Sequence, residues 1–289
     1  MTEVAAPSAS AVLAGAVRQL DAAGVPDAGR DARRLMAHAL EVPPARLSLA
    51  LPEPMTVEAQ ARFATLIARR AERVPLSHIT GEREFWGRAF RVTGDVLDPR
   101  PETETLIEAA LEAPFASVLD LGTGSGCILL TLLAERPGTI GTGTDLSPGA
   151  LAVAAENRAR LGLDPSAALL PGSWTDPLSA DARFDLIVSN PPYIAAGEMD
   201  GLSLEVLRHE PRMALTDEGD GLAAYQAIAA RAPAHLAPGG RLMVEIGPTQ
   251  GPSVAALFAS AGLRDVTVRP DMDGRDRVVS AKSAQNPAS

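Results

Sequence analysis

From about Pro101 onward, short apolar runs alternate with longer amphipathic segments, and this alternation limits the possible folds more than any other feature of the chain. Such alternation produces a mostly parallel sheet with helices on both faces. We predict strands at 117–120, 139–145, 167–170, 184–189 and 241–246, and helices at 102–112, 127–135, 148–161, 221–234 and 254–261. Two late strands, 263–268 and 276–280, have no helix between them and must form a hairpin, which brings one antiparallel strand into the sheet. The predicted fold class is therefore α/β, with a seven-stranded sheet that contains an antiparallel C-terminal strand.

The segment before this domain has helical periodicity. Apolar residues recur at helical spacing from about residue 9 to residue 73, which predicts three helices in a small bundle. Thr56 is a suitable N-cap for the third helix. Residues 84–97 alternate between apolar and polar side chains, which favours a β-hairpin with Gly87 near its turn.

These patterns divide the chain into three parts. We expect a helical bundle at 1–74, a β-hairpin linker at 75–98 and the α/β domain at 99–289. The two ends, 1–8 and 282–289, are rich in Ala, Pro and Ser, a composition that is typical of disordered segments.

The charge of the chain weighs against broad nucleic-acid binding. The formal net charge is -10 and the pI is about 5.0, whereas binding to a phosphate backbone depends on Lys and Arg. One local group of arginines is present, at Arg69, Arg70, Arg73, Arg83, Arg88 and Arg91. This group is either a solvated helix face followed by a hairpin or a docking patch for an acidic partner.

Several classes of protein are not favoured by the composition. The single cysteine, Cys127, cannot form an internal disulfide or a multi-cysteine metal site, and we expect it to be a small core residue. The four histidines are too far apart in sequence to indicate a metal site. Neither a signal peptide nor an apolar stretch of membrane-spanning length is evident, so we expect a cytoplasmic protein.

The four residues Asn190-Pro191-Pro192-Tyr193 follow the predicted strand 184–189. Two successive prolines cannot continue a strand ladder, so the chain must leave the sheet there. Active sites of open α/β sheets lie at such strand ends. An Asn amide and freed backbone carbonyls can bind a planar group that carries an NH2, and a Tyr ring can stack on it. The motif indicates an enzyme that acts on an amide or amino nitrogen.

A glycine-rich loop, Asp120-Leu121-Gly122-Thr123-Gly124-Ser125-Gly126, connects the first sheet strand to its helix. Glycines allow close approach of a ligand, and Asp145 at the end of the next strand can accept two ribose hydroxyls. A dinucleotide fingerprint requires another glycine where this chain has Cys127, and no Walker phosphate loop is present. The pattern favours an adenosine ligand, with an ordinary strand-to-helix turn as the structural alternative.

Two other segments have both a functional and a structural interpretation. Trp174, after the third strand, either stacks on an adenine ring or has a core or capping role. The stretch that contains Arg100, Glu102 and Glu104 either gates the ligand pocket or caps the start of a helix.

Together, the glycine loop and the Asn-Pro-Pro-Tyr motif resemble the S-adenosylmethionine-dependent methyltransferases that modify amino or amide nitrogens. Further segments contribute to the resemblance: Pro75-Leu76-Ser77-His78-Ile79-Thr80-Gly81, Glu84-Phe85-Trp86-Gly87, Pro99-Arg100-Pro101-Glu102-Thr103-Glu104, His209-Glu210-Pro211, Gly219-Asp220-Gly221-Leu222, Glu245-Ile246-Gly247 and Asp273-Gly274-Arg275-Asp276-Arg277. In this order they are similar to the peptide chain release factor glutamine methyltransferase family, from the helical bundle nearly to the C-terminus. The chain departs from the family pattern at 96–98 and in the acidic segment 214–218.

This resemblance implies a Rossmann-like methyltransferase fold and a reaction. The family methylates the side-chain amide of the glutamine in the Gly-Gly-Gln motif of class 1 release factors, with S-adenosylmethionine as methyl donor and S-adenosylhomocysteine as product. From the composition and charge, we expect no metal, no membrane and no direct nucleic-acid partner. Carried over to this chain, the donor site contains Gly122, Thr123, Gly124, Ser125, Gly126, Asp145, Trp174 and Asn190. The resemblance implies that the catalytic residues are Asn190, Pro191 and Tyr193. The glutamine site would consist of Asn190, Pro191, Pro192 and Tyr193.

The mechanism that we expect is mainly one of orientation. An amide nitrogen is a poor nucleophile and a sulfonium methyl is a strong electrophile, so good alignment alone can contribute roughly 7–11 kcal/mol. We expect Asn190 Oδ1 and the Pro191 carbonyl to accept both amide hydrogens, while Tyr193 packs on the amide plane. The bundle at 1–74 is expected to recognise the protein substrate.

Three other functions use similar motifs. A ribosomal-protein glutamine methyltransferase catalyses the same reaction on another protein, and an adenine-N6 or cytosine-N4 nucleic-acid methyltransferase shares the Asn-Pro-Pro-Tyr motif. The acidic pI disfavours the nucleic-acid enzymes. A non-catalytic module that binds an adenosine ligand is disfavoured by the intact motif residues.

Overall fold

The computed structural model describes residues 6–284, and the chain divides into two units. The first consists of Met1–Gly81 with Ser203–His209, and the second of Glu82–Leu202 with Glu210–Ser289. None of the described helices is both long enough and apolar enough to cross a membrane.

The first unit is a helical bundle. Its helices are α1 (Ala9–Ala22), α2 (Ala28–Ala39), α3 (Leu47–Ala50), α4 (Val57–Ala71), α5 (Leu76–Thr80) and α9 (Leu204–His209), with a 3-10 turn at Pro44–Arg46. The three main helices are those predicted from periodicity, and their shared core includes the fully buried Leu35, Phe63 and Ile67. Thr56 caps α4 as predicted, because its Oγ1 accepts from the Ala59 amide at 3.2 Å.

The short helix α9 joins the bundle from a distant part of the chain, which the sequence did not reveal. Glu205 attaches it: Arg73 donates from Nε and Nη2 at 2.8 Å each, and Arg70 donates from Nη2 at 2.9 Å. Arg70 also donates to Asp31 at 2.8 Å. Burial alone would raise the pKa of Glu205, but the hydrogen bonds from these arginines outweigh it and lower the pKa to about 2.

The chain ends are more ordered than their composition predicts. Ser8 Oγ caps α1 by accepting from the Ala11 amide, and the Pro7 carbonyl accepts from the Met55 amide at 3.0 Å. At the other end, Lys282 belongs to the last strand. The predicted disorder is therefore wrong for these residues, since composition does not report backbone pairing with distant segments. The rest of that prediction, at 1–5 and 285–289, falls outside the described residues.

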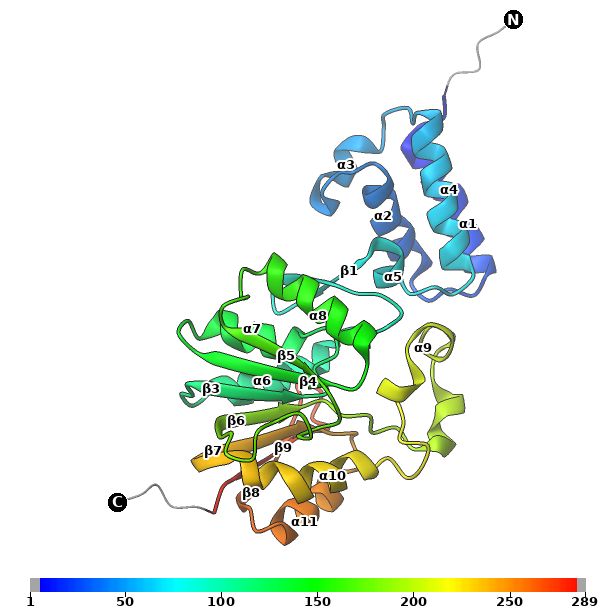
Figure 1. Ribbon diagram of the computed structural model, residues 1–289. Coiled ribbons are helices and arrows are strands. Elements are labelled where there is room, and N and C mark those ends of the chain that lie inside the picture. Colours follow the sequence, from blue (N-terminus) through cyan, green and yellow to red (C-terminus); the bar gives the residue numbers. More distant parts are fainter. Residues whose placement is uncertain (1–5, 285–289) are drawn as a thin grey trace, which may run out of the picture. The chain divides into compact units, whose positions relative to one another are not determined.

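The second unit is a seven-stranded sheet between two layers of helices (Figure 1). Its strands are β3 (Ser117–Leu121), β4 (Ile140–Asp145), β5 (Ala167–Pro171), β6 (Phe184–Ser189), β7 (Leu236–Glu245), β8 (Arg264–Pro270) and β9 (Asp276–Lys282). Helices α6 (Glu104–Leu111), α7 (Cys127–Glu135) and α8 (Pro148–Arg160) cover one face, and α10 (Ala223–Arg231) and α11 (Gly251–Ser260) cover the other. Short 3-10 turns lie at Pro101–Thr103, Ala196–Gly201, Arg212–Ala214 and Ala232–His235. The predicted α/β fold class is confirmed.

The strand order, β5-β4-β3-β6-β7-β9-β8, fixes where a ligand can bind. The order reverses between β3 and β6, and open α/β sheets bind ligands beyond the carboxyl ends of the strands at such a point. Both central strands are buried along most of their length because helices cover both of their faces.

The antiparallel strand is β9, which pairs with β7 on one side and β8 on the other. One antiparallel strand was predicted, but its insertion between two earlier strands was not. β7 also begins earlier than predicted, at Leu236, because Phe184 pairs with Leu236 before a register shift.

A β-hairpin precedes the sheet, with strands β1 (Glu82–Phe85) and β2 (Arg88–Arg91). The two turn residues, Trp86 and Gly87, both have positive φ, of 51° and 67°. Positive φ at both positions matches the twist of a two-residue hairpin, so the predicted turn at Gly87 is confirmed.

Candidate active site

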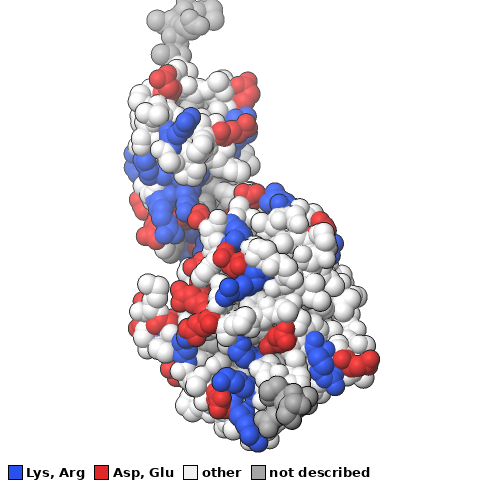
Figure 2. Space-filling model, turned by 90° about the vertical axis from the view of Figure 1, so that its left-hand side faces the viewer, with Lys and Arg blue, Asp and Glu red and all other residues white. Residues whose placement is uncertain are grey.

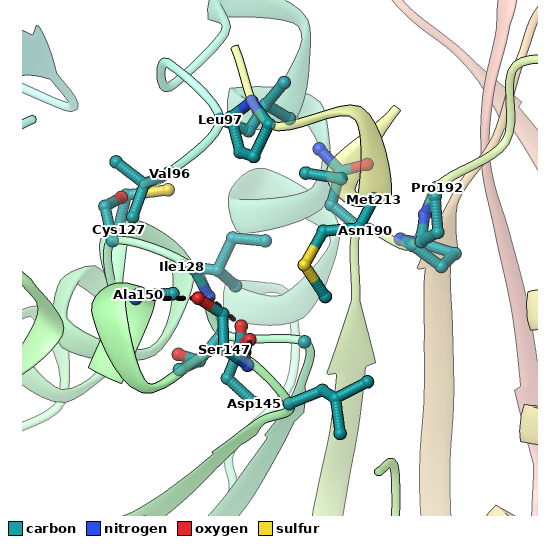
Figure 3. A pocket seen from close by; sticks show the side chains of 18 of the residues that line it. Val96, Leu97, Cys127, Ile128, Asp145, Ser147, Ala150, Asn190, Pro192 and Met213 are labelled. Carbon is teal, nitrogen blue, oxygen red and sulfur yellow. Dashed lines mark hydrogen bonds between the residues drawn. The ribbon is translucent and has the colours of Figure 1, made fainter. Parts of the chain in front are cut away.

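A cavity of about 220 Å³ lies at the carboxyl ends of β3, β4, β5 and β6 (Figure 3). The loops that follow these strands contribute Gly122–Ser125 with Cys127, Asp145–Ser147, Gly172–Trp174 and Asn190–Pro192, and the remaining wall comes from Asp95–Arg100, Thr103, Ile128, Ala150, Pro211, Met213 and Ala214. Every one of these residues belongs to the second unit. The structure thus brings the predicted glycine loop, Asp145, Trp174 and Asn190 to one cavity.

The glycine loop requires left-handed backbone. Gly122, Gly124 and Gly126 have φ of 71°, 57° and 80°, which side chains with a β-carbon rarely adopt. A β-carbon on Gly126 would also lie 2.9 Å from Leu130 Cδ1. Loop and helix therefore pack closely only with glycine here, and the chain turns directly from β3 into α7.

Asp145 connects two of the loops. Its Oδ2 accepts from the Gly124 amide at 2.8 Å, and its Oδ1 accepts from the Ser147 amide at 2.8 Å. Each carboxylate oxygen has a further lone pair, so Asp145 can still accept hydroxyl groups of a ligand. The residue therefore both shapes the glycine loop and offers an acidic acceptor to the cavity.

Two titratable groups lie beside this loop, the fully buried Asp120 and the partly buried Cys127, which lines the cavity. Burial raises the pKa of Asp120 to about 7, although a hydrogen bond from Thr123 to its Oδ2, at 2.7 Å, opposes the rise. Burial also raises the pKa of the Cys127 thiol to about 12. The thiol therefore stays protonated at neutral pH, and it packs against the core as predicted while also lining the cavity.

The position of Trp174 is consistent both with stacking on a ligand and with a packing role in the core. It lines the cavity and also packs against the core on the face covered by α10 and α11. Its φ is 49°, and its Cζ3 lies 3.8 Å from where a β-carbon on Gly122 would be. The strained backbone directs the ring towards the glycine loop, where it can contact a planar ligand.

Asn190 is fixed on one side. Its Nδ2 donates to Thr103 Oγ1 at 3.2 Å, whereas its Oδ1 is buried and has no hydrogen-bond partner among residues 6–284. Figure 3 shows Asn190 and Pro192 on the side of the cavity opposite Val96 and Cys127. A buried amide oxygen without a partner is costly, so it marks a position for a donor from a ligand.

Tyr193 is placed differently from its neighbours in the motif. It does not line the cavity but packs against the core, where burial raises its pKa. Gln250 fixes its backbone, because Nε2 donates to the Tyr193 carbonyl at 2.9 Å. A contact of the ring with substrate stays a prediction.

Further contacts at the site were not evident from the sequence. Arg100 lines the cavity and donates to both carboxylate oxygens of Glu210 at 2.6 Å. Burial raises the pKa of Glu210 and Arg100 opposes this. Glu104 instead accepts from the Trp86 amide at 2.8 Å and fixes the hairpin turn. Neither the 3-10 turn Pro101–Thr103 nor α6 has a side-chain cap from the described residues, so the predicted capping role is wrong, and a role of Arg100 as a gate stays a prediction.

The group of arginines is neither a uniform solvated face nor a free patch. Within the bundle Arg69 is exposed, but Arg70 is buried and ion-paired. Within the second unit, Arg88 pairs with Glu135 and Arg91 with Glu156. Helical periodicity could not reveal these partners, because they lie far away in sequence. Figure 2 shows basic and acidic side chains interspersed on the face that it draws.

The described residues contain no group of three or more His, Cys, Asp or Glu side chains that could hold a metal ion. The site's chemistry is that of backbone amides, one acidic acceptor and an amide oxygen.

Comparisons with known proteins agree with this arrangement. Residues 11–81 match the family model described as PrmC N-terminal domain, and residues 95–222 match the one described as methyltransferase small domain. A protein of Cereibacter sphaeroides named release factor glutamine methyltransferase is 60% identical over 95% of this chain and 98% of its own length. One of the same name from Rhodospirillum rubrum is 45% identical over 91% of this chain and 82% of its own length. A methyltransferase of Pyrococcus furiosus, 16% identical, shares the fold with a TM-score of 0.52 over 69% of this chain and 90% of its own.

Proposed function

Because the chain belongs to the release factor glutamine methyltransferase family, we propose that it methylates the glutamine side chain in the Gly-Gly-Gln motif of class 1 release factors. The observation that carries the proposal is the unpartnered, buried Oδ1 of Asn190 beside the cavity. An acceptor in this position suits the NH2 group of a primary amide. We expect the reaction in the cytoplasm, where release factors act.

The cavity fits S-adenosylmethionine as the donor. Asp145 offers an acceptor for ribose hydroxyls, and Trp174 offers a flat apolar surface for the adenine. The left-handed glycine loop presents backbone without side chains to the cavity. When bound, this donor supplies a methyl group on a positively charged sulfur.

The chain's own contribution is to hold the amide. Asn190 Oδ1 accepts one hydrogen of the glutamine NH2, and the Pro191 carbonyl accepts the other. With both hydrogens bound, the lone pair of the nitrogen is directed at the incoming methyl group. Preorganised acceptors of this kind need no reorganisation during the reaction.

The methyl transfer requires no reagent other than the methyl donor and the glutamine amide. A nitrogen–carbon bond forms and the sulfur–carbon bond breaks, with its electron pair left on sulfur. The nitrogen then loses one proton to solvent. Arg100, paired with Glu210, closes one wall of the cavity and limits the access of water to the reacting atoms.

We assign recognition of the release factor to the bundle, residues 1–74. The support is that every residue that lines the cavity belongs to the other unit, so the bundle is not needed to build the donor site. Leu49 and Val57 are exposed apolar side chains on the bundle, at 77% and 76%. We expect Leu49→Asp with Val57→Asp to raise the KM for the release factor and to leave donor affinity unchanged.

Two other activities share the same chemistry. A ribosomal-protein glutamine is chemically equivalent to the proposed acceptor, and an adenine amino group could also bind Asn190. The interspersed charges in Figure 2 and the net charge of -10 give nucleic acid little support.

One experiment separates these activities. The protein is incubated with methyl-labelled S-adenosylmethionine and, in parallel, a release factor, a release factor with Gln→Ala in Gly-Gly-Gln, ribosomal proteins and DNA. We expect label on the unaltered release factor alone. Label on ribosomal protein or DNA, without label on the release factor, would show that the proposal is wrong.

A further inference from the structure

Asn190 can bind an amide hydrogen only if its oxygen, and not its NH2 group, faces the cavity. We propose that Thr103 and Glu245 are positioning residues that fix this orientation. The proposal deepens the proposed function, and only its kinetic consequence depends on that function.

The fold brings three distant residues together here. The parallel register of β6 and β7 pairs Ser189 with Val244, so Asn190 follows beside Glu245. Glu245 is 1% exposed and lies on the same face of β7 as Met243, which packs in the core cluster of α6. Thr103, 2% exposed, ends the 3-10 turn that precedes α6.

The direction of the hydrogen bonds follows from what each group can donate. A threonine hydroxyl has one hydrogen, whereas an ionised carboxylate can only accept. A hydrogen bond from Thr103 favours the ionised form of Glu245, against burial, which is the larger effect and raises its pKa to about 7. The hydroxyl hydrogen is thereby used, and Oγ1 remains as an acceptor.

This acceptor determines how Asn190 lies. Its Nδ2 donates to Thr103 Oγ1 at 3.2 Å, and Oδ1 is left without a partner among the described residues. If the amide turned over, two acceptor oxygens would face each other and the NH2 group would point to the substrate. A substrate amide hydrogen would then meet a donor, and binding would fail.

Glu245 also makes the arrangement sensitive to pH. Its charged and titratable neighbours are Arg277 on β9, Arg100 and Glu102 before α6, Tyr193 after β6, Tyr225 on α10 and Cys127 on α7. Below about pH 7 the Glu245 carboxylate becomes protonated and can donate a hydrogen bond to Thr103. The hydroxyl is then free to donate to Asn190, and the preference for one orientation weakens.

The orientation can be measured without any substrate. The chain has three asparagines, Asn157, Asn190 and Asn286, so selective 15N-asparagine labelling gives three side-chain NH2 signals. Asn190→Asp identifies the relevant one. Asn157 is an internal control, because its Nδ2 donates to the carbonyls of Arg91 and Ser125.

We expect Thr103→Val to speed hydrogen exchange at the Asn190 NH2 group about tenfold or more, since it removes the acceptor but keeps the shape. Thr103→Ser keeps the acceptor and should retain most of the protection, and the Asn157 signal should not change. In the wild type, protection should fall below about pH 7, and Glu245→Gln should abolish this pH dependence. Unchanged Asn190 exchange in Thr103→Val would overturn the proposal, whether or not the protein methylates release factors.

The kinetic test separates positioning from general damage. Single-turnover methylation of a release factor should slow about tenfold in Thr103→Val, while the dissociation constant of S-adenosylmethionine changes less than about threefold. Thr103→Ser should recover most of the rate. An equal loss in both variants would instead indicate a packing role and contradict the proposal.

Discussion

The two sides of the cavity are built in different ways. The donor side depends on backbone amides and contacts that are close in sequence, such as Thr123 with Asp120, three residues apart, and Gly124 with Asp145, 21 apart. The acceptor side depends on side chains from far away. Asn190 is held by a residue 87 positions distant, and the Tyr193 carbonyl by one 57 positions distant. Contacts that are close in sequence therefore contribute more to the proposed donor side, whereas the proposed acceptor side depends on contacts between distant segments.

The largest effect should come from the acceptor side. Asn190→Ala removes the amide oxygen that we propose as the acceptor for the substrate, and it leaves the Thr103 hydroxyl without its donor. We expect methyl transfer to slow at least about 100-fold, corresponding to several kcal/mol of transition-state stabilisation. Rapid-quench methylation of a release factor measures this rate. Near-normal methyl transfer by a folded variant would show that residues other than Asn190 hold the substrate amide.

A substitution on the proposed donor side should lower the affinity for S-adenosylmethionine and not only the rate of methyl transfer. Asp145→Ala removes the acceptor for the Gly124 and Ser147 amides and an acidic group that lines the cavity. We expect affinity for S-adenosylmethionine to fall about 10- to 100-fold by calorimetry, in line with loss of a charged hydrogen-bond acceptor. Asp164→Ala, at an exposed ion pair with Arg158, is the matched control. If Asp145→Ala did not change the affinity for S-adenosylmethionine, Asp145 would not belong to the donor side.

A smaller effect should follow from loosening the backbone behind the motif. Gln250 Nε2 donates to the carbonyls of Tyr193 and Gly221, and its Oε1 accepts from the Gly247 amide. Gln250→Glu keeps the shape but replaces the donating group with an acceptor. We expect about a tenfold loss in the rate of methyl transfer, with little change in donor affinity. Equal losses in rate and in donor affinity would mean that Gln250 supports both sides.

The smallest effect concerns stability. The folded-state pKa of Glu205 is about 2, below the value near 4.3 of an unperturbed glutamate. The contribution of its ion pairs is therefore complete above about pH 4.3 and is lost as the pH falls towards 2. Glu205→Gln should lower the free energy of unfolding at pH 6 by about 1 kcal/mol, because the amide keeps one oxygen that accepts from the arginines but loses the charge that strengthens these hydrogen bonds. Chemical denaturation at pH 6 and pH 3 measures this, and a difference between wild type and variant that is equal at both pH values would contradict it.

The same contrast explains how much the sequence could predict. β6 was predicted with its observed bounds, because a short, mostly apolar run is followed by Asn190 and two prolines, which cannot continue a strand. The glycine loop and Asp145 also follow local rules of backbone geometry. The insertion of β9 between β7 and β8, and the attachment of α9 through Glu205, depend on contacts between distant segments, and no periodicity reports them.

Candidate residues divide in the same way. Asn190 and Asp145 were identified because a motif or a strand end placed them. Thr103 was visible only as part of a longer motif, and the positioning role that we propose for it depends on its hydrogen bond from Asn190, 87 positions away. Sequence reasoning thus found two residues that line the cavity and missed the residues that hold them in place.

The backbone conformation of Trp174 directs its indole ring towards the cavity, so that its fluorescence can report ligand binding. The chain has two tryptophans, and only Trp174 lines the cavity. The other, Trp86, lies in the hairpin turn, so Trp86→Phe leaves a protein whose tryptophan fluorescence arises from the cavity wall alone. Stacking of an adenine on that indole should quench its emission. Each stage of ligand exchange could then be followed in real time, without any added label.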